Sequence, residues 1–145
     1  MSFKRFMLTE AMLNEAVSAG QLKRLEKELR AVDLKGYELG ITFTRHFIER
    51  VVERSKQDNF TIRDIQMILK GAIDIYGSTM NTLEGRKFAG HFVDAVNGLD
   101  IPFVIQPDTT KLFNMALLPK TVIFRGSERV KKGKFSDGQP VFKVR

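Results

Sequence analysis

The apolar residues of this 145-residue chain change their spacing once, after Gly85, and this change constrains the fold more than any other feature. Before Gly85 they recur every three or four residues, which is typical of helices with one buried face. After it, short apolar runs alternate with turn residues, as in antiparallel strands. Helices followed by such strands predict an α+β fold, with N-terminal helices packed on one face of an antiparallel β-sheet.

Three helices are expected in the first part of the chain. The first covers residues 21–32, where apolar positions form one stripe, and the second covers 44–55. Thr61, with an acidic residue three positions later, is typical of a capping box that begins the third helix, and Gly71 is expected to end it. Gly40 is expected to lie in the link between the first two helices.

The pair Asn97-Gly98 is the strongest hairpin signal in the chain, because both residues tolerate the positive φ of a tight two-residue turn. It is expected to join strands at 87–96 and 99–106. Pro102 suggests that the second of these strands lies at an edge or carries a bulge. Further strands are expected at 113–118, 121–125 and 141–144, with a polar turn region at 133–139.

The length fits one folded domain, so residues 21–145 are expected to form a single α+β domain that follows an N-terminal segment, residues 1–20. The chain has no cysteine, which excludes disulfides, thiolate metal sites and cysteine nucleophiles and favours the cytosol. No apolar run approaches the roughly 20 residues that span a bilayer, so no membrane partner is expected.

Positive charge is concentrated at the C-terminal end of the chain. Residues 120–145 hold eight basic and two acidic side chains, so they account for +6 of the formal net charge of +7. This cluster favours a polyanion partner, above all nucleic acid, although a solvated basic surface that binds nothing specific has the same composition. Phe124 and Phe135 could stack on a base or belong to the core. The candidate nucleic-acid-binding residues are Lys120, Arg129, Lys131, Lys132 and Lys134.

The second expected helix carries the most specific candidate site. On a helical wheel His46, Arg50 and Arg54 fall within one arc, opposite an apolar arc. These residue types suit cleavage of RNA, because a histidine can carry the proton of the 2′-OH and arginines can stabilise the added negative charge on the phosphate. The alternative is an ordinary solvated face, with Glu49 paired to Arg45.

The second histidine, His91, lies in the expected strand at 87–96, where both alternating faces are mostly apolar. It is either a core histidine with one hydrogen bond or a second acid–base group that faces the helical stripe. Two histidines without a His-x-x-x-His or cysteine pair argue against a zinc site. Because no phosphate-binding or dinucleotide fingerprint occurs either, neither a metal nor a cofactor is expected.

The run His-Phe-Ile-Glu-Arg-Val-Val-Glu-Arg, followed by a third helix and a sheet, resembles the RelE-like endoribonucleases, and within them the RegB type of T-even phages. The resemblance spans roughly residues 21–145 and is specific around 42–69. It implies a RelE/RegB-like fold and a phage-encoded, metal-independent endoribonuclease. Such an enzyme cleaves mRNA by attack of the 2′-OH, leaves a 2′,3′-cyclic phosphate and needs no cofactor.

The same resemblance assigns roles to individual residues. The histidine of the helical run matches the catalytic histidine of the family, with the two arginines behind it, and a basic residue matches one on a late strand. The second histidine of the RegB type is matched here by Met67, so the histidine in strand 87–96 is the candidate for the second proton carrier. The catalytic residues implied are His46, Arg50, Arg54, His91 and Arg125.

A second resemblance concerns the first 20 residues, which contain the pattern Leu-x-Glu-Ala twice. These patterns are similar to the sites at which the prohead protease of T-even phages cuts the capsid-targeting leaders of internal head proteins. The alternative is an amphipathic helix in which common helix formers recur by chance. The residues at the two expected processing sites are Glu10, Ala11, Glu15 and Ala16.

Three functions follow as hypotheses. The first is an endoribonuclease of the host cytoplasm whose partner is RNA, specifically mRNA. The second is a non-enzymatic internal head protein, packaged in the virion head, that binds DNA or a host protein. The third is an inhibitor that binds an acidic host protein through the basic C-terminal residues. The oligomeric state stays open.

Overall fold

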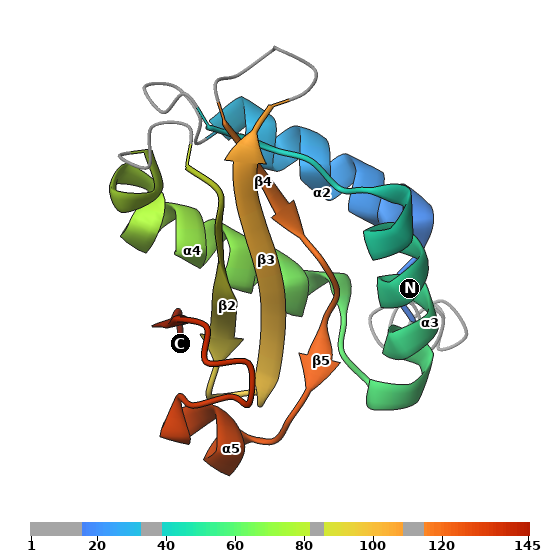
Figure 1. Ribbon diagram of the computed structural model, residues 1–145. Coiled ribbons are helices and arrows are strands. Elements are labelled where there is room, and N and C mark those ends of the chain that lie inside the picture. Colours follow the sequence, from blue (N-terminus) through green and yellow to red (C-terminus); the bar gives the residue numbers. More distant parts are fainter. Residues whose placement is uncertain (1–15, 33–38, 82–85, 109–114) are drawn as a thin grey trace, which may run out of the picture.

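Two long helices cover one face of a six-stranded sheet, a third helix lies beside them, and the C-terminal segment crosses the other face (Figure 1). The computed structural model describes residues 16–32, 39–81, 86–108 and 115–145. In chain order the elements are α2 (Ala19–Val32), β1 (Leu39–Ile41), α3 (Arg45–Asp58), α4 (Ile62–Asn81), β2 (Phe88–Asp94), β3 (Leu99–Pro107), β4 (Met115–Pro119), β5 (Ile123–Phe124), α5 (Ser127–Lys132) and β6 (Val141–Lys143).

The sheet has the strand order β1-β4-β3-β2-β6, with β5 paired to β3 as well. β3 is antiparallel to β2, β4 and β5, but the outer strands β1 and β6 run parallel to β4 and β2. The sheet is therefore mixed, and the expected purely antiparallel sheet is wrong. A hairpin must reverse the chain, whereas the long connections to β1 and β6 let these strands run in the direction of their neighbours. Gly40, expected in a link, lies in β1.

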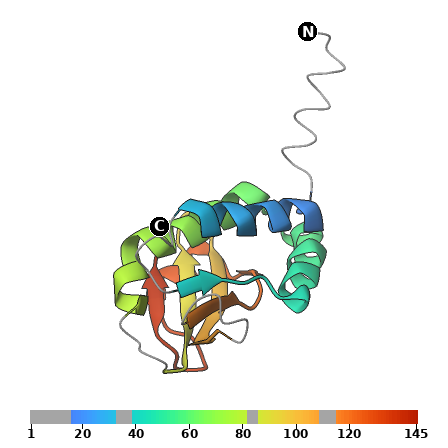
Figure 2. The same cartoon turned by 90° about the horizontal axis from the view of Figure 1, so that it is seen from above.

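The core lies between the sheet and the helices α2 and α4, which Figure 2 shows on the same side. The apolar stripe of α2 is buried as expected, through Leu22, Leu25 and Leu29. From the sheet, Phe92 and Phe103 point into this core with their rings stacked, the centroids 3.9 Å apart. Among the helices of the described ranges, none is both long enough and apolar enough to cross a membrane.

The ends of the helices follow signals present in the sequence. The Thr44 side chain caps α3 by accepting a hydrogen bond from the N–H of Phe47 at 3.1 Å. The same helix ends where Asn59 adopts a left-handed conformation with φ of 57°. Thr61 and Asp64 form the expected capping box, in which the Thr61 N–H donates to the Asp64 carboxylate at 2.9 Å. The start of α4 is thereby confirmed.

The end of α4 expected at Gly71 is wrong, because the helix continues to Asn81. A Cβ at Gly71 would overlap the side chain of Val144, which follows β6. The glycine therefore serves the close approach of α4 to the C-terminal segment and does not end the helix.

Pro102 lies in a central strand, so the expected edge position is also wrong. It pairs with His91 of β2, whose N–H donates to the Pro140 carbonyl on the opposite side, at 2.9 Å. His91 and Pro102 are therefore a non-hydrogen-bonded antiparallel pair, in which the nitrogen of Pro102 points away from β2. On that side β3 pairs with β5 before Pro102 and with β4 after it, so no strand lies opposite the proline nitrogen. Proline fits there because the ladder needs no donor at that position.

The hairpin turn and the start of α5 pack backbone against backbone. Sequence patterns do not predict α5, because it has six residues and buries only Val130. Gly98 has φ of 69°, and its carbonyl accepts hydrogen bonds from the N–H groups of Arg125 and Gly126 at 2.8 and 3.2 Å. A Cβ on Gly98 would lie 2.7 Å from the carbonyl carbon of Gly126. This contact fixes where α5 begins relative to the sheet.

We expect Gly98→Ala to lower the free energy of unfolding by about 3 kcal/mol, because it adds an unfavourable φ and a clash with backbone atoms that cannot rotate away. Gly138→Ala is the matched control: its φ is 68°, but no atom lies within 4 Å of the added Cβ. The control should cost about 1 kcal/mol. Urea unfolding measures both, and equal losses would contradict the packing argument.

Candidate functional site

The residues expected to form the catalytic stripe lie along one face of α3, and we call His46, Arg50 and Arg54 the α3 stripe. The side chains of His46 and Arg50 are exposed and that of Arg54 is half-buried. The neighbouring pair Arg45–Glu49 forms an exposed ion pair at 2.9 Å, as the alternative interpretation of a solvated face expects. The prediction from the helical wheel, that this stripe faces solvent, is therefore confirmed.

A cleft of about 450 Å³ lies between α2 and α3, but the α3 stripe does not line it. Its walls come from Ala19 and Lys23 of α2 and from Arg45, Ile48 and Glu49 of α3. His46 is therefore exposed on the helix surface and does not line this cleft.

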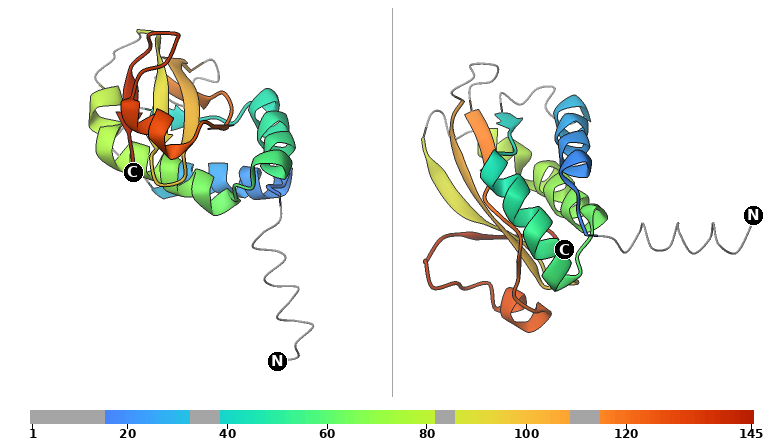
Figure 3. Two further views of the ribbon diagram at one scale, coloured as in Figure 1. Left: turned by 90° about the horizontal axis from the view of Figure 1, so that it is seen from below. Right: turned by 90° about the vertical axis from the view of Figure 1, so that its right-hand side faces the viewer.

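His91, in contrast, is buried, with only 2% of its surface exposed. Its neighbour in β2, Phe92, points toward the helices, so the imidazole points to the opposite face of the sheet. Figure 3 shows the helices on one side of the sheet and the segment after α5 on the other. On that side Nδ1 lies 2.9 and 3.0 Å from the two carboxylate oxygens of Asp100, and Nε2 lies 2.7 Å from Asp137.

Arg125 and Phe135 complete this group, which we call the His91 cluster: His91, Asp100, Arg125, Phe135 and Asp137. Nε of Arg125 donates to Oδ2 of Asp100 at 2.7 Å, and its guanidinium carbon lies 4.3 Å from the centre of the Phe135 ring. The Phe135 ring centroid is in turn 4.6 Å from that of His91. The aromatic ring thus closes the cluster between the two basic side chains.

The His91 cluster balances its charges internally. A carboxylate only accepts hydrogen bonds, so both contacts of His91 are made when both ring nitrogens carry a proton. The Arg125 guanidinium and the His91 imidazole both pair with Asp100, which compensates the burial of this carboxylate, whose exposed fraction is 0%. The pKa of Asp137 is held below its ordinary value, first by the backbone N–H of Gln139, then by the hydrogen bond and charge of His91 and the charge of Arg125.

This geometry suits anchoring better than acid–base chemistry. Both ring nitrogens of His91 are engaged, so neither is open to a substrate in this arrangement. Asp137 and Phe135 belong to the segment between α5 and β6, so the cluster holds that segment on the sheet. The structure therefore favours the interpretation of His91 as a core histidine over that of an acid–base group. The imidazole differs from that interpretation in making contacts through both ring nitrogens and not through one.

The basic residues of the C-terminal part gather around α5. Val130 is buried and attaches the helix, while the cationic side chains on either side of it are exposed. Lys143 of β6 joins them, since its Cε would lie 3.8 Å from a Cβ on Gly133, directly after the helix. Glu128 offsets part of the charge, with its carboxylate 3.8 Å from Lys131. We call these exposed cations the α5 surface: Arg129, Lys131, Lys132, Lys134 and Lys143.

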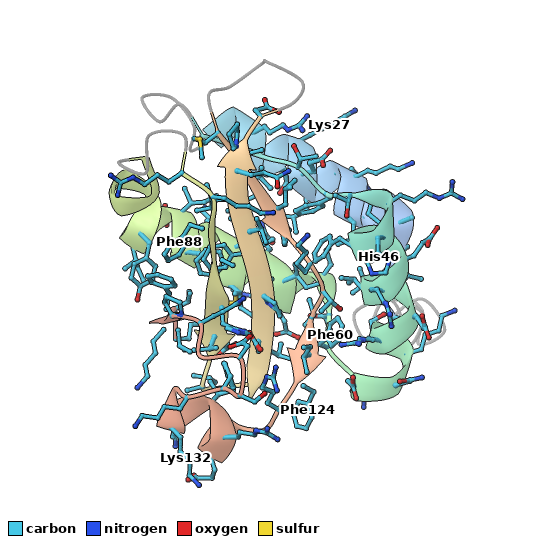
Figure 4. All side chains as sticks on the ribbon, viewed as in Figure 1. Lys27, His46, Phe60, Phe88, Phe124 and Lys132 are labelled. Atoms are coloured by element: carbon cyan, nitrogen blue, oxygen red, sulfur yellow. The ribbon has the colours of Figure 1, made fainter. Side chains whose placement is uncertain are left out.

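The sequence-predicted residues thus fall into three places. His91 and Arg125 come together in the His91 cluster, on either side of a shared carboxylate. His46 lies on α3, on the opposite side of the molecule from Lys132 on α5, as Figure 4 shows. Lys120 is exposed at the end of β4, on a separate element. The structure therefore separates the α3 stripe from both the second histidine and the α5 surface.

Two members of the cluster, Asp100 and Asp137, are not among the sequence-predicted residues. The expected two-residue turn at 97–98 would pair Asp100 with Ala95. The observed loop has four residues, 95–98, and pairs Asp100 with Val93, which puts it diagonally beside His91 on the same face. No local signal exists for Asp137 either, because a long-range contact brings its loop to the sheet. Within the described ranges, no three or more histidine, aspartate or glutamate side chains are placed to hold a metal ion.

Of the expected processing sites, Glu10, Ala11 and Glu15 lie outside the described residues, and Ala16 is half-buried at their start. The next residue, Val17, already belongs to the core, and its N–H donates to the Ser55 hydroxyl of α3 at 2.8 Å.

The two histidines should differ sharply in their effect on stability. We expect His91→Ala to lower the free energy of unfolding by about 3 kcal/mol, because the buried Asp100 loses one of its two side-chain partners. His46→Ala, an exposed control, should change it by less than about 0.5 kcal/mol. Chemical denaturation followed by circular dichroism measures both values. Similar values for the two variants would show that the cluster does not anchor the fold.

Comparison with protein-family models, with curated proteins and with solved structures found no match to this chain. The likeness to the RelE-like endoribonucleases therefore depends on the sequence run of α3 and on the order of the elements after it, and it stays a prediction. What the protein does has to be inferred from the α5 surface, the His91 cluster and the α3 stripe.

Proposed function

We propose that this protein binds RNA through the α5 surface. The observation that carries the proposal is the concentration of exposed cations on and beside one short helix, with Glu128 as the acidic residue among them. Lysine and arginine side chains placed this way neutralise successive phosphates and release the counterions that surround a polyanion.

The α5 surface is also held in a defined position, which favours a binding role over a freely solvated tail. Val130 buries one side of the helix, the backbone of Gly126 bonds to the hairpin turn, and the His91 cluster holds the segment that follows. A preorganised set of cations loses less side-chain and backbone freedom on binding than a disordered one.

The proposal is tested by removing two cations and following the salt dependence. We expect the double variant Lys131→Ala/Lys132→Ala to bind a fluorescent 20-nucleotide RNA at least about tenfold more weakly in low salt. The slope of log K against log salt should fall by about 1.4, since each phosphate contact on a single strand contributes about 0.7. Fluorescence anisotropy at several salt concentrations measures both quantities.

The control is Lys23→Ala/Lys27→Ala, which removes two exposed lysines of α2 and changes the net charge equally. It should leave the salt slope close to that of the wild type. If both double variants lose affinity to the same extent, only net charge matters and the α5 surface is not the binding site.

A second candidate function is cleavage of the bound RNA, and the observation that favours it is the exposure of the α3 stripe. His46 and Arg50 lie one helical turn apart in solvent, so an imidazole could take a proton from a 2′-OH while a guanidinium contacts the phosphate. RNA held at the α5 surface would have to cross the molecule to reach this stripe. We therefore rank binding above cleavage, and keep a RelE/RegB-like fold as part of the second proposal.

If the second candidate is correct, His46→Ala should reduce the rate of RNA cleavage by about 100-fold or more, because a general acid–base group contributes 10²–10⁴-fold. A long mRNA incubated with protein and EDTA, followed by sequencing of ends and detection of 2′,3′-cyclic phosphates, measures this rate. Equal cleavage by both proteins would rule out His46. Binding without cleavage would favour a non-enzymatic role, such as that of an internal head protein.

A further inference from the structure

The two aromatic residues near the basic segment have different surroundings. The ring of Phe135 packs against His91 and Arg125 in the His91 cluster, so these side chains take the place where a base would stack. Phe124 of β5 has 53% of its surface exposed. Of the two phenylalanines, Phe124 is therefore the one with a ring face that a ligand can reach.

Phe124 is held in place by backbone contacts and does not depend on its own side chain for position. It pairs with Leu99 of β3, and the next residue, Arg125, donates its N–H to the Gly98 carbonyl at 2.8 Å. The Arg125 side chain is anchored as well, through its bond to the buried carboxylate of Asp100. An exposed aromatic ring on a fixed backbone loses little freedom when it packs against a ligand.

The ring lies at the same end of the molecule as the α5 surface. Figure 4 shows Phe124 on β5 next to α5, which carries Lys132. Arg129 is five positions after Phe124, so their Cα atoms are at most about 18 Å apart. A second exposed apolar side chain, Val96 at 63%, is close by, since its carbonyl accepts a hydrogen bond from the Ser127 hydroxyl of α5.

We propose that the ligand of this surface is single-stranded nucleic acid, with a base stacked on Phe124 and the adjoining phosphates on the α5 surface. This inference rests on the proposed function and adds to it the strandedness of the ligand and the residue that selects it. Bases in a duplex stack on each other and present no free face, whereas every unpaired base has one. An aromatic ring beside cations therefore favours an unpaired strand.

The experiment compares one sequence as single-stranded RNA, single-stranded DNA and RNA duplex, each with a fluorescent label. Wild-type protein should bind the single strands more tightly than the duplex at equal salt. Phe124→Ala should weaken binding to both single strands about tenfold, within the range for loss of one stacked base, and leave duplex binding unchanged. Phe124→Tyr should bind like the wild type, and Phe124→Leu should remain weak, because leucine is apolar but cannot stack.

Ile75→Ala on α4 is the matched control, since Ile75 is 54% exposed and its truncation should not affect binding. Unchanged melting temperatures establish that the variants fold. If Phe124→Ala or Phe124→Leu binds single strands like the wild type, or if duplex and single strand weaken equally, the stacking proposal is overturned. Should that happen while Lys131→Ala/Lys132→Ala still abolishes binding, the proposed RNA-binding function stands. If the wild type binds none of the three probes, both proposals are wrong.

Discussion

His91 lies between two carboxylates, one on the central strand β3 and one on the loop between α5 and β6, and this arrangement holds that loop against the sheet. A buried carboxylate such as Asp100 is costly unless it is paired and hydrogen-bonded. Here the imidazole and the Arg125 guanidinium both pair with it, and the Phe135 ring packs against both of these side chains. The charge pairing that compensates for burying Asp100 thus also ties a distant loop to the sheet.

The consequence for function is that the exposed cations of the C-terminal segment sit on a fixed frame. α5 follows directly from β5, is attached by Val130, and is succeeded by the loop that the His91 cluster holds. The cations of the α5 surface are thereby held in fixed positions relative to each other, with the exposed ring of Phe124 beside them. The α3 stripe belongs to a different part of the molecule, so RNA bound at the α5 surface does not lie next to His46.

Elements defined by local signals could be predicted from the sequence, whereas those defined by distant partners could not. The capping box at Thr61 and the presence of a hairpin around 97–98 depend on residues within a few positions of each other, and the structure confirms both. The hairpin loop has four residues, 95–98, and not the two expected. The strand β1 and the helix α5 were missed, because three or six residues carry too little periodicity. The helix end predicted at Gly71 was wrong for a related reason. A glycine is common just after a helix, but this one lies inside α4 and allows the close approach of Val144.

The amino-acid sequence by itself determined that the helices precede the hairpin, that positive charge gathers after residue 120, and that His46 faces solvent, because helical period and composition are local properties. Only the tertiary structure decided that His91 is enclosed, that Phe135 is occupied while Phe124 is free, and that the two histidines stand apart. These outcomes depend on which strands pair and on where a loop returns to the sheet. Contacts between residues dozens of positions apart decide both, and no local pattern encodes them.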